Sequence, residues 1–82
     1  MKTQNEIICR ITADKFVSSR KRCAWSMLEL LMSIQYNEKI ENLYTQLREC
    51  DRYENTVCYD LVSLELEKML KELGFSIVYS YS

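Results

Sequence analysis

Four cysteines, at positions 9, 23, 50 and 58, are the residues of this 82-residue chain best suited to chemistry, as nucleophiles, metal ligands or disulfide partners. No two of them have the C-x-x-C spacing of a zinc site, and the chain has no histidine. No apolar run of signal-peptide length precedes them. We therefore expect a cytoplasmic protein with reduced thiols and no metal, in which the cysteines act as small buried hydrophobic residues.

Other catalytic groups are equally scarce. General acid–base and nucleophilic catalysis need a titratable group poised near neutral pH and a neighbour that orients it. The carboxylates are scattered over faces that look exposed, and with Gly74 as the only glycine the chain cannot form a phosphate-binding loop. Cys23 follows three basic residues that can lower a thiol pKa, but a buried helical cysteine is the favoured interpretation. We expect no enzyme activity and no cofactor.

The basic triplet Arg20, Lys21 and Arg22, followed by Trp25, is the sharpest surface feature. It is either a contact for an anion (nucleic acid, a headgroup or an acidic protein patch) or a solvated face with Trp25 turned into the core, and we slightly favour the second interpretation. A net charge of −1 is unlike that of a nucleic-acid-binding domain. Among the functional interpretations an acidic protein partner leads, followed by the chain's own acidic C-terminal part.

The absence of proline and the single glycine favour long helices. Residues 3–6 fit a capping box, Thr3 to Glu6, which predicts a helix through Ile11; we leave open whether it continues through residues 11–13 or is interrupted at Thr12. Apolar residues then recur at helical spacing, and those from Tyr36 to Cys50 follow an a/d pattern that we interpret as core. We predict a helical region over about 13–50 and leave open whether residues 35–37 form a bend or a turn.

The last third of the chain predicts a strand, a helix and a strand. Residues 56–61 alternate as a half-buried strand does, and Ser63 is placed to cap a helix whose apolar stripe ends before Gly74. Gly74 suits the left-handed residue that ends a helix, and residues 75–81 alternate again. A strand–helix–strand unit predicts that its two strands run parallel.

The expected architecture is therefore a single α+β domain over residues 1–82. In it, the helical region 1–50 packs on a C-terminal βαβ unit, residues 56–82. Two strands alone are marginally stable in water, and an open sheet edge invites pairing with another chain. We expect a homodimer or a strand-pairing protein partner to supply the missing surface.

The terminal strand offers the next candidate contacts. Tyrosine is enriched at interfaces because it buries area and keeps a polar end, although it also suits strands in general. The ending Tyr-Ser-Tyr-Ser is typical of an edge and favours an interface. The predicted partner-binding residues are Arg20, Lys21, Arg22, Trp25, Ile77, Tyr79 and Tyr81.

Residues 70–77, Leu-Lys-Glu-Leu-Gly-Phe-Ser-Ile, complete the layout of a long polar N-terminal helix, a strand and a second helix. This layout resembles a class of small tailed-phage proteins, and in particular the cytoplasmic antiholins (rapid-lysis accessory proteins) of T-even phages. The resemblance implies a cytosolic protein that binds the short cytoplasmic segment of the phage holin and delays lysis. No site motif of that family matches, so no residue role is transferred.

Taken together, these patterns predict a non-catalytic, phage-type regulatory protein that captures a protein segment. One alternative is an inhibitor of a host enzyme or defence complex. Another is a small nucleic-acid-binding regulator that uses Arg20 to Arg22. No stretch of the chain is apolar and long enough to predict a membrane span.

Overall fold

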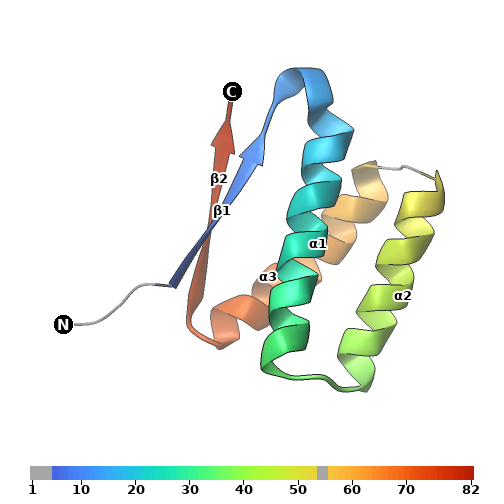
Figure 1. Ribbon diagram of the computed structural model, residues 1–82, viewed down its shortest axis with the longest axis vertical. Helices are drawn as coiled ribbons and strands as arrows, with labels where there is room; N and C mark the ends of the chain where they lie inside the picture. The colour runs from blue at the N-terminus through green and yellow to red at the C-terminus, as the bar shows by residue number, and fades with distance from the viewer. Residues whose placement is uncertain (1–4, 54–55) are drawn as a thin grey trace.

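The computed structural model describes residues 5–53 and 56–82, which form an α+β fold, as expected. Helices α1, α2 and α3 follow one another between two terminal strands (Figure 1). The elements are β1 (Asn5–Ile11), a 3₁₀ turn (Ala13–Lys15), α1 (Phe16–Ile34), α2 (Glu38–Tyr53), α3 (Thr56–Glu72) and β2 (Phe75–Tyr81).

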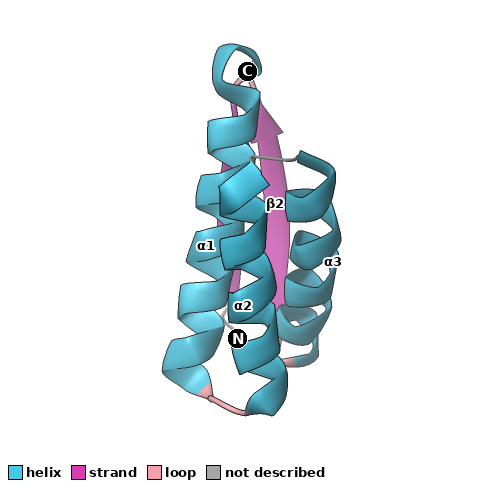
Figure 2. Cartoon of the chain, turned by 90° about the vertical axis from the view of Figure 1, so that its right-hand side faces the viewer, coloured by secondary structure: helices cyan, strands magenta, loops and turns pink. Residues whose placement is uncertain are grey.

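The two strands come from opposite ends of the chain and pair in parallel. Their register runs from Asn5 beside Phe75 to Ile11 beside Tyr81. The ladder continues past the strands, because the Ser82 N–H donates to the Ile11 carbonyl (3.0 Å) and the Ala13 N–H donates to the Ser82 carbonyl (3.2 Å). Parallel strands need a long crossover, and here all three helices form it. Helices α1 and α3 pack on one face of the sheet, with α2 outside them (Figure 2).

The helix predicted for residues 3–11 is wrong. Thr3, half of the expected capping box, lies outside the described residues, and Glu6 lies within β1. The run is rich in β-branched isoleucine, which suits a strand, and its burial follows a period of two. Inward-facing residues are Ile7, Cys9 and Ile11, whereas Glu6, Ile8 and Arg10 are exposed.

The strand predicted for residues 56–61 is also wrong, because these residues form the first turns of α3. The apparent alternation misled: Tyr59 is fully buried, whereas Val57 and Leu61 are 61% and 62% exposed, so the three do not share a face. Ser63, the expected cap, is a buried mid-helix residue. The parallel partner of β2 is therefore β1.

Other boundaries agree with the prediction. Residues 35–37 separate α1 from α2, which settles the open question in favour of a turn. The Asn37 side-chain oxygen accepts the Ile40 N–H (3.0 Å) as an N-terminal cap of α2. Gly74 has φ +96°, a conformation that side chains with a Cβ rarely adopt, and it links α3 to β2.

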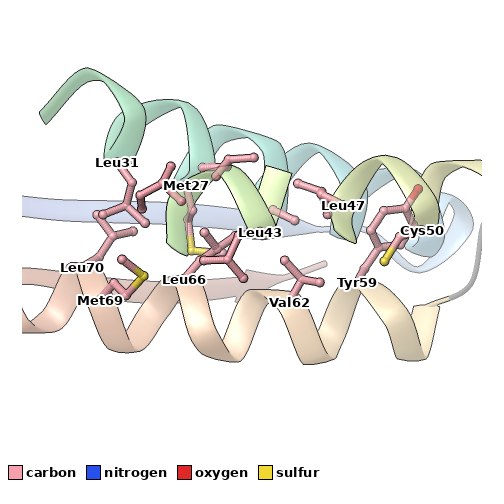
Figure 3. Packing of buried hydrophobic residues seen from close by; sticks show 13 residues of the cluster. Met27, Leu31, Leu43, Leu47, Cys50, Tyr59, Val62, Leu66, Met69 and Leu70 are labelled. Atoms are coloured by element: carbon pink, nitrogen blue, oxygen red, sulfur yellow. The ribbon is translucent and has the colours of Figure 1, made fainter. Parts of the chain in front are cut away.

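The main core lies where the three helices face one another and the inner face of the sheet (Figure 3). The a/d run of α2 points into it, as predicted, apart from the exposed Tyr36 that precedes the helix. A smaller cluster of Cys9, Ile11 and Cys23 joins β1 to α1. The main core comprises Ala24, Met27, Leu28, Leu31, Ile40, Leu43, Leu47, Cys50, Tyr59, Val62, Leu66, Met69 and Leu70.

The expectation of four reduced thiols is wrong, because Cys50 and Cys58 form a disulfide with a Cα–Cα distance of 5.5 Å. The end of α2 and the start of α3 bring the two residues together across the short connection between these helices. Cys9 and Cys23 are free and buried.

We predict that reducing this disulfide lowers the free energy of unfolding by about 2–3 kcal/mol, because the unfolded chain regains the entropy of a loop of about nine residues. Urea unfolding with and without dithiothreitol measures the change. A Cys58→Ser variant should not respond to the reductant. Alkylation of four cysteines in the denatured, unreduced protein would contradict the disulfide.

Candidate partner-binding surface

The basic triplet does not form one surface, because consecutive residues of a helix point about 100° apart. Arg20 points toward α3 and β2, and Lys21 points toward the end of α2. Arg22 is exposed beside β1. The three charges that look like one patch in the sequence therefore serve three different parts of the molecule.

Arg20 links three elements of the structure. Its guanidinium forms an ion pair with Asp60 of α3 and lies 5.3 Å from the centre of the Tyr79 ring of β2. The Tyr79 hydroxyl donates to the Glu67 carboxylate of α3. The Arg20 side chain is largely buried, and its Nε has no hydrogen-bond partner among the described residues. Arg20 thus packs as part of the interior and presents little charge to an external anion.

Two other residues of the predicted binding surface, Trp25 and Lys21, contact Asp51 of α2. The Trp25 indole N–H donates to its Oδ2 (3.0 Å), the Tyr59 hydroxyl donates to its Oδ1 (2.6 Å), and the Lys21 Nζ lies 3.9 Å from Oδ1. The Trp25 ring also packs edge-on against Tyr44, 5.6 Å between ring centres. Trp25 therefore joins α1 to α2, as the interpretation of a tryptophan turned into the core expects.

The predicted contacts on β2 fall on its inner side. Ile77 and Tyr79 are half-buried against the helices, so a charge at either position would disturb folding before it tested binding. Tyr81 is different: it is 67% exposed, and its ring stacks on that of Tyr79 with 6.3 Å between centres.

The outer face of the sheet carries exposed apolar residues that the sequence analysis did not single out. Ile8 and Val78 are partners in the strand register and are 56% and 40% exposed. Polar residues surround them: Glu6, Arg10, Ser76 and Ser80. Within the described residues the sheet has only its two strands, so both edges are unpaired. If the alternation over positions 6–11 had been interpreted as that of a strand, it would have predicted this outward-facing surface.

A hollow of about 180 Å³ lies between β1 and α1. Ile8 and Arg10 line it from the strand, and Arg22 and Ser26 line it from the helix. Arg22 thus lines a recessed surface, and Arg10 accompanies it there.

A second exposed apolar surface lies on α3. Val57, Leu61 and Leu64 occupy the side of the helix opposite the core, and Leu64 is as exposed as Leu61. Sequence analysis missed this stripe because it placed residues 57 and 61 in a strand.

The free thiols of Cys9 in β1 and Cys23 in α1 lie beside each other in the small cluster between the strand and the helix. Burial raises the pKa of Cys9 to about 12, and its hydrogen bond with the Cys23 thiol adds to the shift. Cys9 therefore stays protonated at neutral pH and is a poor nucleophile.

The described part of the chain contains no group of His, Cys, Asp or Glu residues that could hold a metal ion. Among the helices described, none combines the length and apolar character needed to cross a bilayer.

We predict that Asp51→Ala lowers the free energy of unfolding by about 2–3 kcal/mol, because it removes the carboxylate that accepts from the Trp25 indole and from the hydroxyl of the buried Tyr59. Urea unfolding followed by tryptophan fluorescence measures this loss. The exposed neighbour Glu49 provides the control, since Glu49→Ala should change stability by less than about 0.5 kcal/mol. Equal effects of the two substitutions would refute a structural role for Asp51.

Stability should fall in alkaline solution. Burial and the Glu67 hydrogen bond raise the pKa of Tyr79, as burial raises that of Cys9, so the folded protein holds these protons more tightly than the unfolded chain. The free energy of unfolding should be level to about pH 8 and decline as the pH rises through the ordinary thiol and phenol pKa values of about 9 and 10. Tyr79→Phe should flatten the decline above pH 10 in denaturant titrations. An unchanged slope would contradict this assignment.

Comparison with known proteins gives no relative to guide the assignment of this surface. No family model matches the chain, and no curated protein or solved structure matches it either.

Proposed function

We propose that this chain is a small non-catalytic regulatory protein that binds another protein through the outer face of its sheet and the free edge of β1. The observation that carries the proposal is a two-stranded sheet with helices on one face only and no further strand at either edge in the part of the chain described. Such a sheet leaves backbone donors and acceptors unpaired beside exposed apolar side chains.

The composition of this surface supports a protein partner. An apolar centre, Ile8 and Val78, within a rim of charged and hydroxyl side chains is the arrangement typical of protein interfaces. The α3 stripe offers apolar area alone, whereas the sheet adds main-chain hydrogen bonding. Nucleic-acid binding by the basic triplet has less support, because Arg20 and Lys21 are engaged by Asp60 and Asp51.

The identity of the partner comes from the resemblance alone. The layout on which that resemblance was drawn has a long N-terminal helix followed by a strand and a second helix, whereas in the structure the N-terminal element is a strand and residues 56–61 are helical. The cytoplasmic segment of a phage holin is the specific candidate. A host enzyme or a host defence complex is the alternative.

The test compares two pairs of substitutions of equal chemistry. We predict that Ile8→Glu with Val78→Glu weakens capture of the protein partner at least ten-fold, because burying two new carboxylates without partners costs more than about 1.4 kcal/mol. Leu61→Glu with Leu64→Glu, on the α3 stripe, should leave capture unchanged.

The partner is identified by mass spectrometry after capture from phage-infected cells, and its affinity for each variant is then measured with the purified proteins. Circular dichroism confirms that both variants fold. Loss of binding only in the α3 variant would move the interface to α3. Capture of nucleic acid that is released steeply by salt would overturn the proposal as a whole.

A further inference from the structure

We infer that the free edge of β1 receives an extended acidic segment of the partner as a third strand, held between β1 and α1 with its carboxylates against Arg10 and Arg22. This inference rests on the proposed function and specifies the chemistry of the partner. Addition of a strand at an open edge is an established mode of peptide recognition, in which main-chain hydrogen bonds supply affinity and side-chain contacts supply specificity.

The ladder shows which backbone groups of β1 are available. The Ile11 carbonyl and the Ala13 N–H both bond to Ser82, so odd-numbered residues of β1 turn their peptide groups toward β2. Because successive residues alternate, the even-numbered residues Glu6, Ile8 and Arg10 turn theirs toward the open edge. These three residues provide the donors and acceptors for a third strand.

The surface beside this edge is shaped for a strand rather than for a small molecule. The hollow between β1 and α1 has a volume of about 180 Å³, below the roughly 300–1,000 Å³ typical of small-ligand sites. Its lining includes the edge residues Ile8 and Arg10 on the side of the strand and Arg22 and Ser26 on the side of the helix. An extended segment can follow the strand along this hollow and continue beyond both ends.

The charges in the hollow select an acidic occupant. Arg10 and Arg22 are exposed, and neither forms an ion pair within residues 5–53 and 56–82. Arg10 projects from the strand and Arg22 from the helix, so they approach the edge from opposite faces of the sheet. Side chains of a strand alternate between faces, so two consecutive acidic residues would meet both arginines.

A second copy of this chain does not fit the same edge. α1 packs on β1 and α3 on β2 (Figure 2). Helix axes lie about 8–10 Å apart but strands only about 4.8 Å, so two helices on two strands extend past the edges of the sheet. Antiparallel pairing of two β1 strands would place both copies' helices on the same face, where the two α1 helices would overlap. A segment without its own covering helix avoids this clash.

The probe is a capped octapeptide of valine and threonine with two central glutamates. Matched peptides carry two glutamines or two lysines at the same positions. Titration into the isotopically labelled full chain, followed by NMR, should shift the amide signals of Ile8, Arg10 and Ser26 and slow the hydrogen exchange of the Ile8 amide. The glutamine peptide should bind about 3- to 10-fold more weakly, and the lysine peptide more weakly still.

Two sets of variants test the backbone and the charges separately. Ile8→Pro removes an N–H that points away from β2, so the sheet should persist while binding falls at least ten-fold; Ile8→Val keeps the N–H and should bind normally. Arg10→Glu with Arg22→Glu should abolish the preference for the acidic peptide. Lys68→Glu with Lys71→Glu, on the exposed side of α3, makes the same charge change elsewhere and should preserve the preference.

Equal binding of the acidic and glutamine peptides, shifts confined to another surface, or normal binding by Ile8→Pro would overturn the inference. Failure of all three peptides would also overturn it. The proposed function is judged separately, because a protein partner captured equally by the wild type and by Ile8→Pro removes the contact at the edge of β1 but leaves binding through the outer face of the sheet standing.

Discussion

The structure depends on one constraint, which is that the two ends of the chain must pair as parallel strands. Parallel strands cannot be joined by a tight turn, so the connection has to pass over a face of the sheet. Here the connection is the whole helical part of the molecule, and it covers only the inner face. The bare outer face and the open edges are consequences of the same constraint, because residues 5–53 and 56–82 contain no further element that covers them.

Helix α1 is the element through which the other parts are held in place. Its apolar residues face the main core, Cys23 packs beneath β1, and its polar side chains reach two separate acceptors. Arg20 reaches Asp60 and the Tyr79 ring, and Trp25 reaches Asp51. A buried or half-buried polar contact is costly when its partner is displaced, so these contacts favour one arrangement of the helices over its alternatives. Two of the residues that look most like an external binding patch, Arg20 and Trp25, are thereby engaged in contacts between elements of the fold, whereas Arg22 remains exposed.

The surface left for recognition is small and chemically mixed. An edge strand is a hazard for any sheet, and charged residues on it discourage indiscriminate pairing. Glu6 and Arg10 flank the apolar Ile8 on β1, which restricts the segments that can add there. Helix α1, which packs on β1 and extends past the edge of the sheet, further limits access to that edge. In the interaction proposed above, the same features that protect the edge from aggregation also restrict it to one kind of extended partner.

Local pattern alone was sufficient for the α+β class, the a/d face of α2, the glycine that ends α3 and the strand β2; at residues 35–37 it located a change of helical phase but left open whether this is a bend or a turn. Each depends on residue spacing or on the backbone freedom of a single residue, which are local properties. Pattern failed at residues 5–11 and 56–61, where short apolar runs are compatible with either period, and long-range packing decided between them. Which cysteines pair, and where three consecutive basic residues point, depended on how the helices pack. The sequence by itself determined which segments are apolar and where most of them end; only the tertiary structure decided which strand partners β2 and which arginines remain exposed, because both follow from contacts between residues far apart in the chain.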